Sequence, residues 1–177
     1  MQKSKKAILS NPKKLTLALV NDTGRLIESR IEIESVINNI DRWCNLVPEL
    51  LVNGEIKTTT IPFIQLKNKL IPDQLVGIIS PWNFPLLLSL IDAIPSLIAG
   101  CAVIVKPSEI VPRFIQPLLE TIATVPLLND IFTYIEGAGE TGANLIEYVD
   151  FICFTGRVAT GKKLAESAAK NFIPASL

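Results

Sequence analysis

The sequence contains no histidine among its 177 residues, and this absence limits the chemistry open to the chain. Ser-His-Asp triads, Cys-His dyads and histidine-ligated metal sites are all excluded. Cysteine is scarce as well: Cys44, Cys101 and Cys153 lie far apart, which fits neither a zinc-binding spacing nor an even set of disulfides. We therefore expect no metal site, and a reducing, cytoplasmic location.

Charge of either sign is sparse: charged residues make up 19% of the chain, and 17 Lys and Arg balance 17 Asp and Glu. A neutral chain offers no basic surface for phosphate contacts, so we expect no nucleic-acid partner. Apolar residues make up 49%, which excludes a disordered chain. Residues 75–105 hold a single charge, Asp92, but Pro81, Pro85 and Pro95 divide them. We expect buried strands and a helix there, and no membrane contact.

The first part of the chain, residues 1–74, is expected to be a helical segment that packs on the core. Its first fourteen residues carry five lysines and no acid, which predicts a solvated, frayed terminus. Residues 21–24, Asn-Asp-Thr-Gly, predict a turn. After it, apolar residues recur at three- and four-residue steps, as on one face of a helix that Pro48 disturbs near its end. These residues are Ile33, Val36, Ile37, Ile40, Trp43, Cys44 and Val47.

From residue 75 onward, short apolar runs alternate with segments of helical length. The runs are 75–80, 101–106, 131–136 and 150–154, and the expected helices are 86–99, 112–125, 141–147 and 158–170. Such alternation forms βαβ units, so the predicted fold is α/β: a Rossmann-like parallel sheet with helices on both faces, preceded by the short helical segment. Ligands of such sheets bind beyond the carboxyl ends of the strands, which makes the residues after each run the candidate site.

Polar residues follow the first two runs. Asn83 stands in a proline-braced turn, where its amide can stabilise an oxyanion or only cap the next helix. Lys106, Ser108 and Glu109 follow the second run. An acid at this place in a dinucleotide fold commonly accepts hydrogen bonds from the adenosine ribose, and a lysine can donate to the same hydroxyls. Ser108 and Glu109 equally suit a helix start, as N-cap and first-turn acid.

Glycine turns follow the other two runs. Residues 137–142 read Gly-Ala-Gly-Glu-Thr-Gly, where close backbone approach and a helix N-terminus favour a phosphate. This motif follows the third strand rather than the first, and it lacks the acid expected about 20 residues further on. In the turn after the fourth run, Gly156 and Arg157 can hold a phosphate or form an ordinary turn with a solvated arginine.

Three of these stretches resemble, in order and spacing, motifs of the NAD(P)-dependent aldehyde dehydrogenase superfamily. They are Val76-Gly77-Ile78-Ile79-Ser80-Pro81-Trp82-Asn83-Phe84-Pro85, Ala99-Gly100-Cys101-Ala102-Val103-Ile104-Val105-Lys106-Pro107-Ser108-Glu109 and Phe154-Thr155-Gly156. Residues 15–43 also look like the family's early helices, so the resemblance covers nearly the whole chain. It implies that residues 75–177 are part of a dinucleotide-binding domain, in a chain truncated to part of the family's N-terminal region.

The resemblance assigns roles to the residues after the first two strands. It implies that the Asn83 amide belongs to an oxyanion hole. It also implies that Lys106 and Glu109, with Ser108 between them, hold the adenosine ribose of NAD or NADP. Glu109 slightly favours NAD, because a carboxylate repels a 2′-phosphate.

Further cofactor-binding positions follow from the same resemblance. Trp82, Gly156 and Gly161 resemble positions around the pyrophosphate, and Ser80 is placed with them. Arg157 stands where the family usually has serine, and it can pair with a phosphate or displace it. The positions that resemble glycines near the adenine are Gly137 and Gly139.

The family's chemistry uses a cysteine thiolate that attacks the aldehyde, hydride transfer to nicotinamide, and a water activated by a base. Neither the nucleophilic cysteine nor the Glu-Leu-Gly-Gly stretch that carries the base is present up to Leu177, and the three cysteines stand in apolar surroundings, typical of small hydrophobes. We therefore expect a chain with the design of an aldehyde dehydrogenase that does not oxidise aldehydes on its own. Three alternatives stay open: an inactive NAD(P)-binding module, half of a split enzyme that a second chain completes, and a relic that folds poorly.

Overall fold

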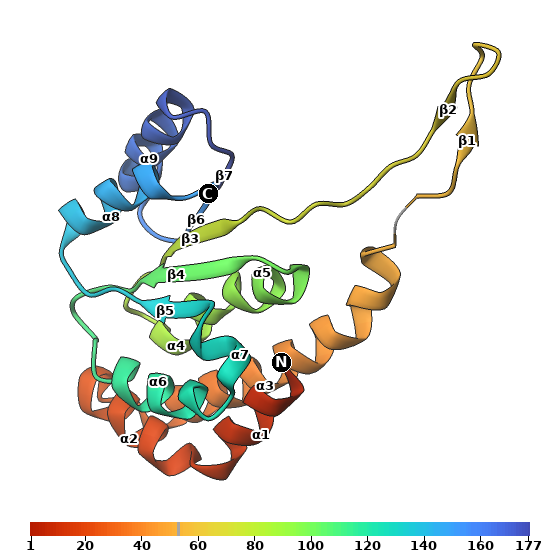
Figure 1. Ribbon diagram of the computed structural model, residues 1–177. Coiled ribbons are helices and arrows are strands. Elements are labelled where there is room, and N and C mark those ends of the chain that lie inside the picture. The colour runs from red at the N-terminus through yellow and green to blue at the C-terminus, as the bar shows by residue number, and fades with distance from the viewer. Residues whose placement is uncertain (53) are drawn as a thin grey trace.

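The computed structural model describes residues 1–52 and 54–177, and a five-stranded parallel sheet lies at its centre (Figure 1). The strands are β3 (Leu75–Ile79), β4 (Ala102–Lys106), β5 (Phe132–Tyr134), β6 (Phe151–Phe154) and β7 (Ala175–Ser176). They are ordered β5-β4-β3-β6-β7, and every neighbouring pair is parallel. The first four lie inside the apolar runs of the sequence, whereas nothing in the sequence pattern predicts β7.

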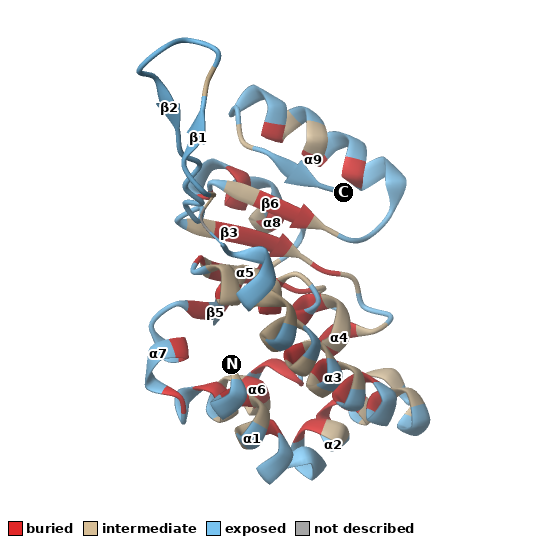
Figure 2. Ribbon diagram, turned by 90° about the vertical axis from the view of Figure 1, so that its right-hand side faces the viewer, coloured by how far each residue is buried: buried red, intermediate tan, exposed pale blue. Residues whose placement is uncertain are grey.

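Helices cover both faces of this sheet. The helices after β3 are α4 (Pro85–Leu90), α5 (Ala93–Ala99), α6 (Ile115–Ala123), α7 (Pro126–Asn129), α8 (Gly139–Leu145), the short 3-10 helix η1 (Ile146–Tyr148) and α9 (Val158–Lys170). Val76 and Val103 pack into a core cluster with the helices that precede β5, whereas Ile152 packs with α8 and α9. Figure 2 shows β3 and β6 largely buried between these layers, whereas β7 at the edge of the sheet is exposed. The predicted α/β class is confirmed.

The N-terminal helices correct one prediction. They are α1 (Gln2–Ser10), α2 (Pro12–Thr23) and α3 (Leu26–Leu50). The expectation of a frayed terminus is wrong, because Ile8 is buried in the main core cluster and α1 packs on α3 and α6. The lysines of α1 are compatible with this packing because Lys3 and Lys6 are exposed and Lys5 pairs with Asp41 of α3. The predicted turn is confined to Gly24, which ends α2 in the left-handed conformation (φ 71°).

Two predicted helices differ from the structure, and a proline breaks one of them. The segment 86–99 forms α4 and α5 rather than one helix, because the ring of Pro95 would clash with the carbonyl of Ile91 in a continuous helix. The segment 112–125 is shorter than predicted, since α6 begins only at Ile115. Pro126 then opens the separate helix α7, and Val125 before it has a non-helical backbone (φ −119°, ψ 90°). None of the helices in the described ranges is both long and apolar enough to cross a membrane.

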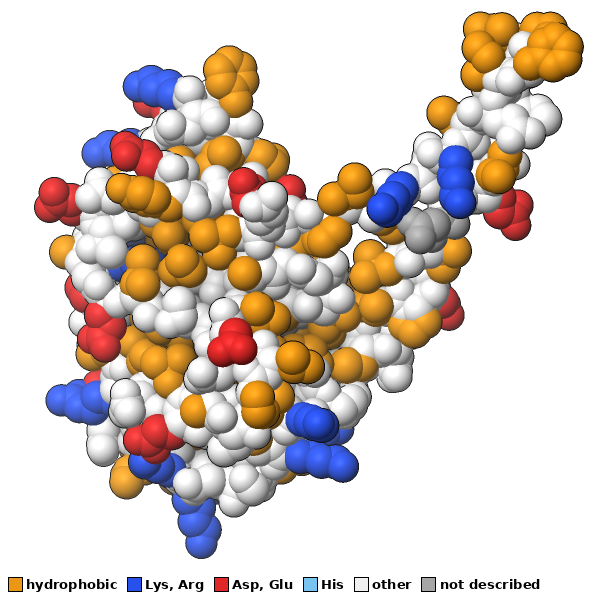
Figure 3. All heavy atoms as spheres, in the orientation of Figure 1, with side chains coloured by type: hydrophobic (Ala, Val, Ile, Leu, Met, Phe, Trp, Pro, Cys, Tyr) orange, Lys and Arg blue, Asp and Glu red, His pale blue; other side chains and the backbone are white. Residues whose placement is uncertain are grey.

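The helices of the N-terminal segment end at Leu50, and a two-stranded antiparallel hairpin follows. Its strands are β1 (Lys57–Thr58) and β2 (Gln65–Leu66), and it extends away from the sheet (Figure 1). Apolar side chains gather at its tip (Figure 3), where Phe63 is fully exposed with a φ of 69°. The hairpin precedes β3 and therefore lies opposite the edge at which the candidate site residues are found.

Candidate functional site at the carboxyl edge of the sheet

The carboxyl ends of β3, β4, β5 and β6 lie at one edge of the sheet, on the left in Figure 1. Backbone hydrogen bonds keep these ends level: Ser80 N–H donates to the carbonyl of Lys106 (3.2 Å), and Thr155 N–H donates to that of Ile79 (3.1 Å). β4 and β5 lie on one side of β3 and β6 on the other, so the strand order reverses beside β3. Open α/β sheets bind ligands at such a reversal. All the predicted site residues belong to strand ends, loops and helix starts at this edge.

The segment after β3 presents Asn83 and Trp82 at the surface. Trp82 is 51% exposed, and the backbone carbonyl of Asn83 accepts a hydrogen bond from the guanidinium of Arg25. No side chain at the start of α4 acts as its N-cap. The reading of Asn83 as a helix cap is therefore wrong, and its side-chain amide has no hydrogen bond among the described contacts of the chain.

A distant carboxylate takes the place of that cap. Glu32 is 1% exposed, and its Oε2 accepts hydrogen bonds from the N–H groups of Leu86 (2.9 Å) and Leu87 (3.0 Å) at the start of α4. Burial raises the pKa of Glu32, while the two backbone donors and the nearby charge of Arg25 act in the opposite direction. The carboxylate thus satisfies two amides that the short helix cannot satisfy itself.

Ser80 is buried at the end of β3. Its Oγ is the one buried side-chain polar atom in the described ranges without a hydrogen-bond partner. Alternation along the strand places Ser80 on the same face as Val76 and Ile78, which pack toward the N-terminal helices. A buried hydroxyl without a partner costs free energy, so a ligand or water at this position would be favoured.

Lys106 and Glu109 form an ion pair at the end of β4. The ammonium Nζ lies 2.9 Å from Oε2 of Glu109, and the two side chains are 6% and 55% exposed. The hydrogen bond from Lys106 lowers the pKa of Glu109. Ser108 accepts a hydrogen bond from the N–H of Ile110 within a turn, and α6 begins only at Ile115. The helix-start reading of this segment is therefore wrong.

Two of the three glycines of the 137–142 motif, Gly137 and Gly142, stand where a side chain would clash or crowd its neighbours. Gly137 has a φ of 154°, and a Cβ there would lie 2.0 Å from Oγ1 of Thr141. Gly142 is buried where α8 packs on the sheet, since a Cβ would lie 3.3 Å from Cδ1 of Ile79 and 3.9 Å from Cδ of Lys106. The same contact places the Lys106 side chain on the face that α8 covers. Gly139 faces open space at the start of α8.

A groove of about 460 Å³ lies beside β6 and α9. Phe154 forms part of its lining, and both glycines of this turn accommodate the ring: a Cβ would lie 2.5 Å from it at Gly156 and 3.3 Å at Gly161. Arg157 is exposed, and no side chain in the described part of the chain caps the N-terminus of α9. The rest of the lining is Thr155, Val158, Lys162, Ala165 and Leu177.

The cysteines lie in surroundings that suit small hydrophobic residues. Cys101 and Cys153 are buried and free, and burial raises the pKa of both thiols, that of Cys153 to about 12. Neither is suited to act as a nucleophile. Cys44 is half-buried on α3. The described residues contain no group of three or more Cys, Asp or Glu that could hold a metal.

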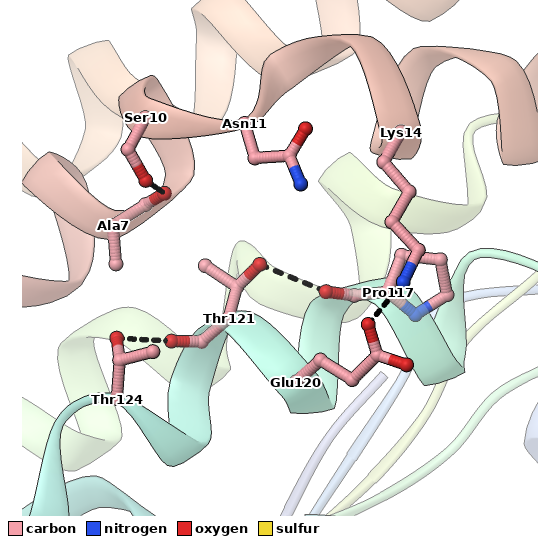
Figure 4. A pocket seen from close by; sticks show the side chains of 8 residues that line it. All are labelled: Ala7, Ser10, Asn11, Lys14, Pro117, Glu120, Thr121 and Thr124. Carbon is pink, nitrogen blue, oxygen red and sulfur yellow. Dashed lines mark hydrogen bonds and ion pairs between the residues drawn. The ribbon is translucent and has the colours of Figure 1, made fainter.

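A second groove, of about 240 Å³, lies between the α1–α2 corner and α6 (Figure 4). An ion pair between Lys14 and Glu120 crosses it, and Thr121 and Thr124 direct their hydroxyls to backbone carbonyls of α6. The charged groups and hydroxyls that line it therefore already have partners. The groove contains none of the predicted site residues.

Arg25, Glu32 and Asp22 are N-terminal side chains that bind segments following β3 and β4, and sequence reasoning did not assign any of them a role. Asp22 accepts hydrogen bonds from the backbone N–H (2.8 Å) and the guanidinium of Arg113, in the loop before α6. A signal for Glu32 was present: it stands one residue before Ile33 and four before Val36, on the buried face of α3. An acid on an apolar helix face indicates a buried partner.

The sheet and its strand order give this chain a Rossmann-like α/β fold, a class whose open sheets commonly bind dinucleotides at the carboxyl edge. The residues at that edge suit such a ligand: a donor and an acceptor side by side, an uncapped helix N-terminus and a buried hydroxyl without a partner. The chain belongs to the aldehyde dehydrogenase family, whose model matches residues 1–177. The resemblance inferred from the motifs is confirmed.

Individual relatives support this assignment. The 4,4′-diapolycopene aldehyde oxidase of Methylomonas sp is 32% identical over 178 residues, which cover 98% of this chain and 34% of the relative. The peroxisomal aminoaldehyde dehydrogenase 1 of Malus domestica is 38% identical over 162 residues, which cover 88% and 32%. This chain thus spans about a third of the length of these curated relatives.

Solved structures give the same result. The structure of the aldehyde dehydrogenase PutA from Anabaena variabilis has 63% identity and a TM-score of 0.94, over 98% of this chain and 37% of that one. Betaine aldehyde dehydrogenase from Staphylococcus aureus, in complex with NAD+, has 29% identity and a TM-score of 0.87, over 98% and 35%.

Proposed function

We propose that this chain forms the dinucleotide-binding part of an NAD(P)-dependent aldehyde dehydrogenase. The observation that carries the proposal is the Lys106–Glu109 pair at the end of β4, next to the reversal of strand order. Each hydroxyl of a ribose diol can both donate and accept a hydrogen bond. The ammonium of Lys106 can donate to such a hydroxyl, and the carboxylate of Glu109 can accept from one. Each group keeps free hydrogen-bonding capacity after their mutual contact.

The β6–α9 turn supports the proposal from the other side of β3. The first N–H groups of α9 face no capping side chain, so the positive end of the helix is available to a phosphate. Lys162 lines the same groove, and the exposed Arg157 directly precedes α9, so both add positive charge near this turn. We propose that this turn binds the pyrophosphate, with Trp82 and Ser80 lying along the cofactor on the β3 side.

Asn83 is the residue for which we propose a catalytic role. Its side-chain amide is free, and its backbone is fixed, as an oxyanion donor requires. The nicotinamide of the bound cofactor would accept the hydride of the aldehyde oxidation. Cys101 and Cys153 are buried with raised pKa values, so we propose that the 177 residues bind the dinucleotide without oxidising aldehydes. A complementing chain, supplying nucleophile and base, is the second form of this proposal.

We further propose a modest preference for NAD over NADP. Glu109 carries a negative charge beside the proposed ribose, and it already engages the ammonium that would otherwise attract a 2′-phosphate. The Glu109→Gln substitution removes that repulsion and releases Lys106. It should therefore weaken NAD+ binding and improve binding of NADP+ relative to NAD+.

Isothermal titration of the purified chain with NAD+ and NADP+ tests these proposals. We expect saturable binding of NAD+, loss of most of it in Lys106→Met, and the shift described above in Glu109→Gln. The matched control is Glu120→Gln, which breaks the exposed pair with Lys14 on the other side of the molecule. No binding of either dinucleotide by the well-folded chain would refute the proposed function. Production of NADH from aldehydes by the chain alone would refute the claim of inactivity.

A further inference from the structure

The N-terminal helix α3 makes an unusual set of contacts with the segment that carries Asn83. The carboxylate of Glu32 is buried and receives two backbone N–H groups, those of Leu86 and Leu87. Among the described residues Glu32 has no ion-pair partner, although the charge of Arg25 acts on it. A buried carboxylate is costly, and in this fold its only hydrogen-bond donors within the described ranges are those two amides. Its place in the structure is therefore tied to the start of α4.

Arg25 holds the same segment at its other end. Its guanidinium Nη2 donates to the backbone carbonyl of Asn83, and its Cζ lies 5.1 Å from the centre of the Phe84 ring, within the range of a cation–π contact. Arg25 directly precedes α3, and Glu32 lies two turns further along the same helix. Arg25 and Glu32 thus bind the backbone of the segment at the carbonyl of Asn83 and at the N–H of Leu86, three residues later. We call these backbone contacts the grip.

This grip leaves one group of the segment free. The backbone of residues 83–87 is fixed by contacts to main-chain atoms, while the Asn83 side chain takes part in none of them. Only six residues make up α4, so the helix itself holds its first turn weakly. We infer that Arg25 and Glu32 are positioning residues, which fix the backbone of residues 83–87 and thereby aim the Asn83 amide at the carboxyl edge of the sheet. The aim of this amide rests on the function proposed above, whereas the grip on the backbone does not.

Hydrogen exchange measured by NMR tests the grip directly. In Glu32→Met, which keeps the length of the side chain but has no acceptor, the Leu86 and Leu87 amides should exchange at least tenfold faster. Glu32→Gln keeps one acceptor oxygen and should change these rates much less. If Glu32 acted by packing alone, Met and Gln would give the same rates, and that result would overturn the inference.

Arg25 is tested in the same way, and it keeps the inference open to test if Glu32→Met does not fold. Arg25→Met should shift the side-chain NH2 signals of Asn83, which are assigned by their loss in Asn83→Asp, and should alter the emission of Trp82 in a Trp43→Phe background. Arg25→Lys should restore part of both signals. Glu120→Gln is the control that should leave them unchanged. Unaltered Asn83 and Trp82 signals in Arg25→Met would overturn the inference for this residue.

Binding of NAD+ separates this inference from the proposed function. If the parent chain binds NAD+, Glu32→Met and Arg25→Met should weaken it at least threefold, and Glu32→Gln should weaken it less. Unchanged affinity in both Met variants would refute the link between the grip and the site. If the parent chain does not bind NAD+, the proposed function fails, while the exchange rates and the Asn83 signals still decide whether the grip exists.

Discussion

The Lys106–Glu109 pair leads to an asymmetric prediction about stability. The lysine is 6% exposed and the glutamate 55% exposed, and their charged atoms lie 2.9 Å apart. Glu109→Gln leaves a buried ammonium without its counter-charge. A hydrogen bond to a charged group contributes about 1.5–3 kcal/mol, and the exposure of Glu109 reduces this, so we expect a loss of about 1–1.5 kcal/mol in the free energy of unfolding.

Lys106→Met should behave differently. It removes the buried charge and fills the same space with an apolar side chain, and such replacements are often neutral or stabilising by about 1 kcal/mol or more. The released Glu109 is half-exposed and can be hydrated at little cost. The double variant should therefore resemble Lys106→Met rather than the sum of the two single changes.

Urea unfolding followed by circular dichroism measures these differences, provided that the denaturant slope stays constant among the variants. The exposed pair between Lys14 and Glu120 supplies the control, since the unfolding midpoint of Glu120→Gln should not differ measurably from that of the parent. The reasoning would be refuted if Lys106→Met destabilised the fold more than Glu109→Gln. Such a result would mean that the lysine contributes through packing or other contacts, not through the pair.

Three further predictions concern the packing, the titration and the thiols of the fold. Gly142→Val places new atoms against Ile79 and should destabilise the protein by about 1–3 kcal/mol. Gly139 faces open space, so Gly139→Ala should not destabilise it. Equal effects of the two substitutions on thermal unfolding would contradict the packing role of Gly142. Burial raises the pKa of Asp92, so the folded state binds a proton there more tightly than the unfolded state; this contribution to stability is present below the ordinary carboxyl pKa and is lost as the pH rises through the raised value. Asp92→Asn should therefore be more stable than the parent at pH 7, with the difference disappearing toward pH 3.5, and a constant difference in unfolding midpoints across that range would argue against it. Finally, Cys101 and Cys153 should resist a thiol reagent at pH 8 until the protein is denatured. Fast labelling of either thiol in the native protein would contradict its burial.

Local sequence patterns were sufficient for much of the secondary structure. The apolar runs contain β3 to β6, and α9 coincides with the predicted helix over 158–170. These elements are readable because the residues that define them are neighbours in sequence and follow one period. The break between α4 and α5 was less readable, although Pro95 signalled it, because a proline can either break a helix or lie in its first turn.

The sequence pattern was misleading where burial depends on distant partners. The lysine-rich first residues suggested a frayed end, but α1 turns Ile8 toward α3 and α6, while Lys5 pairs with Asp41 of α3. Ser108 and Glu109 suggested a helix start, yet Glu109 pairs with Lys106 within a turn. In both cases the composition was compatible with two structures, and the choice was made by contacts that no short window of sequence contains.

The sequence by itself determined which residues lie at the ends of the strands, because strand length and hydrophobic period are local properties of the chain. It also carried the motifs that predicted an aldehyde dehydrogenase. Only the tertiary structure decided that β4 and β5 lie on one side of β3 and β6 on the other, and that Arg25 and Glu32 reach across more than fifty residues to hold the Asn83 segment. Such contacts form between elements that fold together, and their free energy depends on burial that exists only once the sheet and its helices are assembled.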